Sequence, residues 1–173
     1  MADPRHFDVV IIGAGIAGAS LAVALSGEGL SIALVEAQAL GATALPLATS
    51  LSDFDPRVSA LTPRSSAFLQ QLGAWEAIAA YRHCAYNHMT VWDGEGTGQI
   101  EFDRAEVGVT KLGNIVENRA IVHALHARVS GAADISVISP VALQSCTRLA
   151  SSGMSLELDG GELIAQSVAI LEW

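Results

Sequence analysis

Cysteine and basic residues are both scarce in this sequence. Cys84 and Cys146 are its only cysteines, and they lie far apart with no metal-binding or redox spacing, so we expect two reduced thiols rather than a disulfide framework. Nine lysines and arginines stand against 18 aspartates and glutamates, which gives a formal net charge of -9. An acidic surface of this kind repels phosphate backbones, so we expect no nucleic acid partner.

Charge is absent from residues 9–25, a run apolar enough to raise the question of a membrane span or a signal peptide. Three glycines interrupt the run, Asp8 precedes it, and no basic region with a small-residue cleavage site frames it. We therefore predict a buried strand followed by a buried helix, with no targeting signal. The expected location is the cytoplasm, with peripheral membrane association as the alternative.

The first 36 residues predict a strand, a helix and a second strand. Residues 7–12 form a β-branched run that stops at a glycine, residues 16–28 are rich in alanine and leucine, and residues 30–36 form another apolar run. Three such elements within about 30 residues have the size of a βαβ unit.

A glycine-rich sequence, GAGIAG, joins the first strand to the helix. In such a motif Gly13 permits the tight turn, Gly15 lets a diphosphate approach the backbone, and Gly18 lets the helix lie close to the strand. The helix start at Ile16 and Ala17 offers free N–H groups and a partial positive charge to phosphates. The alternative is a glycine-rich turn in an ordinary α/β protein.

An acidic residue, Glu36, ends the second predicted strand, 18 residues after Gly18. A carboxylate at this position can accept hydrogen bonds from ribose hydroxyls, and it would repel a 2′-phosphate, which disfavours NADP. The spacing alone does not separate FAD from NAD.

Further elements follow along the chain, including a helix capped by Thr62 and Pro63 and another that Asn118 is expected to cap. Turns at Ser152-Gly153 and at 159–161 predict an antiparallel β-meander. The expected helices cover 63–72, 75–80 and 119–129, and the expected strands cover 88–92, 99–103, 135–138, 141–149, 154–158, 162–167 and 168–171.

Four segments resemble one enzyme family in their order along the chain: DPRVSAL at 55–61, LGAW at 72–75, MTVWD at 89–93 and IVENR at 115–119. They are similar to the ubiquinone-biosynthesis ring hydroxylases, which are class A flavoprotein monooxygenases related to para-hydroxybenzoate hydroxylase. The resemblance implies one noncovalent FAD, NAD(P)H as a transient reductant, and hydroxylation of a polyprenylphenol or another phenolic quinone precursor. The flavin carries that chemistry, while the protein supplies position, electrostatics and water exclusion.

The resemblance also assigns residues by position. It implies that Arg57 reaches the cofactor region and that Arg119 contacts the flavin side, roles that suit the donor fork of a guanidinium; solvated surface cations are the alternative for both. No catalytic residue is identified. His123 and His126 lie three residues apart on one predicted helix, but no carboxylate or cysteine completes a metal site, so we expect none.

The expected fold is therefore α/β, with an FAD-binding Rossmann-like βαβ unit, a β-meander and the start of a substrate-domain sheet. We assign 1–80 and 114–173 to the FAD-binding domain and 81–113 to the substrate domain. Full family members carry a second flavin motif after the strand that matches 168–170, so we expect this chain to be a truncated N-terminal part. An NAD-dependent oxidoreductase and a non-catalytic remnant with weak ADP or FAD binding are the alternatives. A ubiquinone-biosynthesis complex is a possible partner, and the oligomeric state is left open.

We expect the 173-residue chain by itself not to hydroxylate a phenol. A flavin held only at its ADP end is not oriented for reaction with oxygen and substrate. The measurement is NADPH-dependent product formation by the purified chain with added FAD, beside a full-length family member as control. Measurable hydroxylation by the chain alone would contradict this expectation.

Overall fold

The computed structural model divides the chain into two compact units. One unit comprises residues 1–44 and 122–173, and the other comprises residues 45–121. The residues that the structure describes are 4–40, 45–47, 50–150 and 152–171. The assignment of 1–80, 81–113 and 114–173 to cofactor and substrate domains stays a prediction, because compactness does not show what either unit binds.

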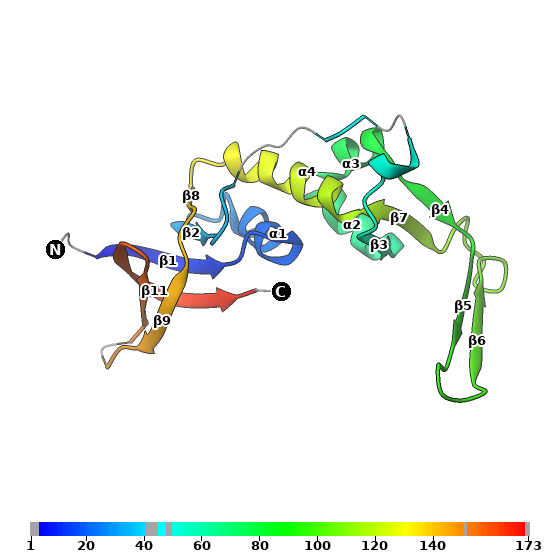
Figure 1. The fold of residues 1–173 in the computed structure, drawn as a ribbon. Helices are drawn as coiled ribbons and strands as arrows, with labels where there is room; N and C mark the ends of the chain where they lie inside the picture. The colour runs from blue at the N-terminus through cyan, green and yellow to red at the C-terminus, as the bar shows by residue number, and fades with distance from the viewer. Residues whose placement is uncertain (1–3, 41–44, 48–49, 151, 172–173) are drawn as a thin grey trace. The chain divides into compact units, whose positions relative to one another are not determined.

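A six-stranded mixed sheet forms the first unit, with strand order β8-β2-β1-β11-β10-β9 (Figure 1). β1, β2, β8 and β11 run parallel, whereas β9, β10 and β11 form the predicted antiparallel meander. The strands are β1 (Arg5–Ile12), β2 (Ile32–Val35), β8 (Ile135–Ile138), β9 (Leu143–Arg148), β10 (Met154–Leu158) and β11 (Gly161–Ile170).

The four parallel strands end level with one another. Ile12 pairs with Val35 and with Ile170, and Val35 pairs with Ile138. The chain leaves all four strands at one edge of the sheet. In open α/β sheets, ligands bind outside the carboxyl ends of the strands, so this edge is the place to look for a site.

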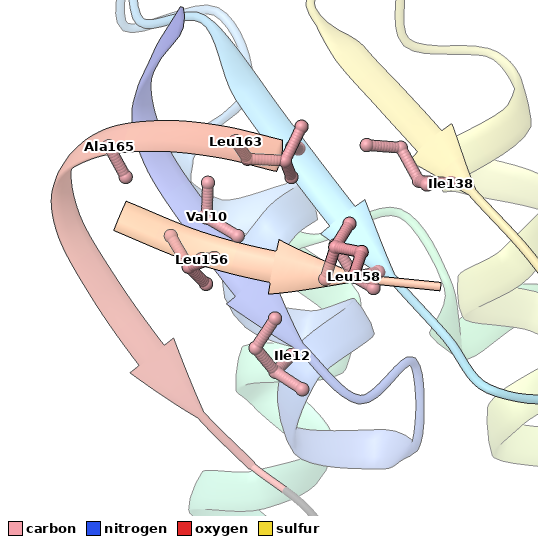
Figure 2. Packing of buried hydrophobic residues seen from close by; sticks show 9 residues of the cluster. Val10, Ile12, Ile138, Leu156, Leu158, Leu163 and Ala165 are labelled. Carbon is pink, nitrogen blue, oxygen red and sulfur yellow. The ribbon is translucent and has the colours of Figure 1, made fainter. Parts of the chain in front are cut away.

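Side chains of β1 and β2 alternate between two packed faces, as strand geometry requires. On one face Val10 and Ile12 join a cluster with Leu156 and Leu163 of the meander, all of them at most 2% exposed (Figure 2). The meander is therefore part of the core of this unit. Ile11 points to the opposite face, where helix α1 (Ile16–Leu25) packs.

Helix α1 ends three residues before the predicted position. The Ser26 hydroxyl and the Gly27 N–H both donate to the Asp134 carboxylate, at 2.7 Å each, and Gly27 adopts a φ of 86°. Glycine is the residue that reaches this left-handed conformation without strain. A contact from a distant loop therefore terminates the helix earlier than its local sequence indicates.

The second unit holds two small sheets. Its three-stranded sheet has the order β3-β7-β4, and β5 and β6 form a separate antiparallel ribbon. The elements are η1 (Leu51–Asp53), β3 (Val58–Leu61), α2 (Pro63–Gln71), α3 (Trp75–Tyr81), β4 (Cys84–Tyr86), β5 (His88–Trp92), β6 (Gln99–Asp103) and β7 (Gly113–Glu117), and α4 (Asn118–Ser130) begins in this unit and continues into the other.

Most of the predicted elements are confirmed, and β5, β6, β8 and β10 have the predicted bounds. The Thr62 side chain caps α2 by accepting a hydrogen bond from the Ser65 N–H at 3.2 Å. Three differences stand out: β3, β4 and β7 were not predicted, 162–167 and 168–171 form the single strand β11, and α4 starts at Asn118 itself. The Asn118 side-chain oxygen accepts from the Ser59 hydroxyl at 2.6 Å, which ties the helix start to β3.

None of the helices in the described part of the chain has the length and apolar character needed to cross a bilayer.

Candidate dinucleotide site

The glycine-rich loop lies at the carboxyl edge of the sheet, between β1 and α1. Gly13 adopts a φ of 95°, a left-handed conformation that favours glycine, and its N–H donates to the Val35 carbonyl at 2.8 Å. The loop therefore turns out of β1 while it remains bonded to the end of β2.

Gly15 and Gly18 have opposite surroundings. A Cβ built on Gly18 would lie 1.8 Å from the Gly13 carbonyl oxygen, so α1 can approach the loop this closely only with glycine at that position. A Cβ built on Gly15 would meet nothing within 4 Å. The backbone is thus packed tightly at one glycine and accessible at the other, as the sequence predicts for a diphosphate loop.

No side chain among the residues that the structure describes caps the N-terminus of α1. Gly15 is its N-cap residue and supplies no side chain, and no acidic residue occupies the first turn. The first N–H groups of a helix have no acceptor within the helix, and they carry the positive end of its dipole. The amides of Ile16 and Ala17 are therefore among the donors that this end presents.

Glu36 follows β2 directly and turns its side chain toward the loop. One carboxylate oxygen accepts from the Ala14 N–H at 2.8 Å, and the other accepts from the Gln38 N–H at 2.9 Å. A carboxylate has about four acceptor positions, so these two bonds leave acceptor capacity for other donors. The Ala14 amide, which precedes the helix, is therefore bound to Glu36, and the expectation of free N–H groups at Ile16 and Ala17 is not affected by this contact.

His126, which the sequence offers only as a candidate metal ligand, also contacts this loop. The His126 Nε2 atom lies 2.7 Å from the Ala14 carbonyl oxygen, across 112 residues of sequence. Among the described residues there is no cluster of histidine, cysteine and carboxylate side chains that could hold a metal ion. His126 is a loop contact, and no local pattern around it predicts that.

Arg57 and Arg119 belong to the second compact unit, residues 45–121, so their contacts are described within that unit. Arg57 is exposed; its N–H donates to the Asp55 carboxylate at 2.9 Å, and its carbonyl accepts from the Asn118 N–H at 2.9 Å. The Arg57 backbone is thus bonded to Asn118, the residue that precedes Arg119. In the described part of the chain no ion pair involves the Arg57 guanidinium.

Arg119 is held by Glu117. Its Nε donates to a carboxylate oxygen of Glu117 at 2.7 Å, a second nitrogen lies 2.6 Å from the same oxygen, and that nitrogen also donates to the Asp53 carbonyl. Arg82 lies 2.8 Å from the other Glu117 oxygen. Glu117 therefore joins two cations while its own side chain is only 6% exposed.

The same carboxylate fixes the chain before β3. The Asp55 N–H donates to Glu117 at 3.0 Å, and Arg82 lies over the rings of Phe54 and Tyr81, at 4.4 Å and 4.3 Å. Burial by itself would raise the pKa of Glu117, but the Asp55 N–H and the Arg119 and Arg82 guanidinium groups outweigh burial and hold that pKa below its usual value. Glu117 is thus an ionised anchor for the segment that leads to Arg57.

Together, the level strand ends, the glycine loop and the acid after β2 define a dinucleotide-binding α/β fold. Residues 8–134 match the family model described as FAD dependent oxidoreductase, and the chain belongs to this family. The family match decides between the two cofactors that spacing had left open, in favour of FAD.

Relatives of known name agree with the resemblance. The chain is 31% identical over 163 residues to the 3-demethoxyubiquinol 3-hydroxylase of Escherichia coli, covering 94% of this chain and 40% of that protein. It is 35% identical over 131 residues to the human mitochondrial ubiquinone biosynthesis monooxygenase COQ6, covering 74% of this chain and 27% of that protein. The chain thus spans well under half the length of these relatives.

Solved structures show the same fold. The p-nitrophenol 4-monooxygenase PnpA from Pseudomonas putida superposes with a TM-score of 0.72 at 15% identity, over 97% of this chain and 41% of that one. The anhydrotetracycline hydroxylase OxyS from Streptomyces rimosus superposes with a TM-score of 0.71 at 18% identity, over 97% of this chain and 32% of that one.

We predict unequal stability effects at the two glycines. Gly18→Ala should lower the free energy of unfolding by about 2–3 kcal/mol, because the new methyl group overlaps the Gly13 carbonyl. Gly15→Ala should change it by less than about 1 kcal/mol, because the space is open. Urea unfolding of both variants measures the difference, and equal losses would contradict the packing described.

We predict that Glu117 stabilises the protein in a pH-dependent way. Its pKa is lowered in the folded state, so its contribution is full above the ordinary carboxyl pKa of about 4.3 and is lost as pH falls through the lowered folded-state pKa. Glu117→Gln should cost about 2–3 kcal/mol at pH 7 and progressively less in acid. Thermal melts across pH test this against Glu106→Gln, which alters an exposed glutamate of the same unit. A Glu117→Gln deficit that persists unchanged in acid would refute the prediction.

Proposed function

We propose that this chain forms the ADP-binding part of an FAD-dependent monooxygenase that hydroxylates the aromatic ring of a quinone precursor. One observation carries the proposal: at the edge where four parallel strands end level, Gly18 packs against the Gly13 carbonyl while the backbone of Gly15 has open space around it. The family of the chain and the names of its ubiquinone-biosynthesis relatives support the cofactor and the substrate class.

The loop and Glu36 fit the ADP half of the cofactor. The amides of Gly15, Ile16 and Ala17 would donate to the diphosphate, and Gly13 would give the loop its turn. The remaining acceptor positions of Glu36 would bind ribose hydroxyls, and its charge would exclude a 2′-phosphate. When bound, FAD supplies the redox chemistry of hydroxylation, with NAD(P)H as the transient reductant.

Arg57 is proposed to reach the cofactor region, and Arg119 is proposed to contact the flavin side of the cofactor. The exposed guanidinium of Arg57 is available to a ligand, while Arg119 is oriented by Glu117. A guanidinium held by a buried carboxylate has little freedom left to lose when it binds, which favours a fixed positioning role.

Residues 81–113 are proposed to begin the substrate domain. In the β5–β6 ribbon, Met89 lies opposite Phe102 and Val91 lies opposite Ile100, and all four side chains are at least 38% exposed. An apolar strand face of this kind suits contact with an apolar ring substrate. Such a substrate would be met at a membrane surface or within a ubiquinone-biosynthesis complex, with the enzyme otherwise in the cytoplasm.

We expect the 173-residue chain to bind ADP and to prefer it over adenosine 2′,5′-bisphosphate. Glu36→Gln should weaken ADP binding about tenfold and reduce that preference, because a charged acceptor is lost. Calorimetric titration gives the dissociation constants. Glu28→Gln is the matched control, since Glu28 is an exposed glutamate of the same unit.

Two outcomes would count against the proposal. Failure of the unaltered chain to bind either ADP or FAD would remove the cofactor site, and an unchanged preference in Glu36→Gln would remove Glu36 from it.

A further inference from the structure

Ala14 is bound on both sides of its backbone within the glycine loop. Its N–H donates to the Glu36 carboxylate at 2.8 Å, and its carbonyl lies 2.7 Å from the Nε2 atom of His126 on α4. Ala14 is 2% exposed, so water has little access to replace either partner. The loop is thus held from the end of β2 and from a helix 112 residues away.

The contact with the carbonyl determines where the next amide points. A peptide unit is planar and trans, so the Ala14 C=O and the Gly15 N–H point in opposite directions. Because the carbonyl points at His126, the Gly15 N–H is directed away from α4. No acceptor for that N–H is found in the described part of the chain.

The chemistry of the contact defines the role of the histidine. A carbonyl oxygen only accepts hydrogen bonds, so the Nε2 atom must carry the proton. Donation to the carbonyl also polarises the peptide unit and strengthens its N–H as a donor. Without that donor, a buried carbonyl would be left unsatisfied, and the peptide plane would lose the contact that orients it.

We propose that His126 is a positioning residue of the dinucleotide site: by donating to the Ala14 carbonyl, it holds the Ala14–Gly15 peptide in the orientation that presents the Gly15 N–H to a diphosphate. The inference rests on the proposed function and adds to it a residue from outside the βαβ unit. His126 acts through the loop and does not itself contact the ligand.

Substitutions on α4 test this with ADP as the probe. His126→Leu should raise the dissociation constant for ADP roughly three- to tenfold, the effect expected for one misdirected hydrogen bond. His126→Gln, whose side-chain amide can donate to the same carbonyl, should restore affinity to within about twofold. His123→Leu and His123→Gln are the matched controls, one turn earlier on the same helix, and should leave ADP affinity unchanged.

The outcomes separate the inference from the proposed function. If the unaltered chain binds ADP and His126→Leu binds it equally well, the inference fails and the proposed function stands; if the unaltered chain binds no ADP, both fail. His126→Gln as weak as His126→Leu would also overturn the inference, as would equal losses in the His123 variants. Melting temperatures are measured alongside, because a merely structural role would lower them without selective loss of ADP affinity.

A measurement on the unaltered protein avoids any folding defect of the variants. Nitrogen-15 NMR of the His126 ring should show the proton on Nε2. A ring protonated only on Nδ1 would leave Nε2 unable to donate and would overturn the inference.

Discussion

The close approach of α1 to the end of β1 is the constraint on which the rest of the site depends. The Gly13 carbonyl occupies the place where a side chain of residue 18 would lie, so the helix start sits directly against the loop. This approach places uncapped helix amides beside the edge where β1, β2, β8 and β11 end level. Helix dipole, open backbone and sheet edge thus coincide at one place, which is the requirement for binding a diphosphate.

The side chains of Glu36 and His126 hold the glycine loop, and Glu117 holds a loop of the second unit in the same way. Glu36 and His126 bind the two polar groups of Ala14, so the loop is held before any ligand arrives. Glu117 joins Arg82 and Arg119 and also accepts from the Asp55 N–H, which orders the segment before Arg57. In both units a charged or polar side chain from a distant segment fixes a loop. A loop that is already ordered loses less conformational entropy when a ligand binds.

The parts of the structure that could be predicted from the sequence are those with local signals. The βαβ unit follows from apolar runs broken by glycines, and α2 follows from Thr62 and Pro63. Strands β3, β4 and β7 were not predicted because their local sequence favours no strand: VSAL and CAY hold few β-branched or aromatic residues, and GNIVE begins with glycine and asparagine, which are depleted in strands. The contacts of Glu36 and His126 with the loop could not be predicted, because they join residues 22 and 112 positions apart and no local sequence pattern indicates such a contact.

The central claim is that the backbone between β1 and α1 binds a diphosphate. The most direct test is an ADP titration of the nitrogen-15-labelled chain, followed through its backbone amide resonances. The account predicts saturable shifts that are largest at Gly15, Ile16 and Ala17, with smaller ones at Glu36. Saturation with its largest shifts outside residues 13–18, or no saturable shift at all, would contradict it.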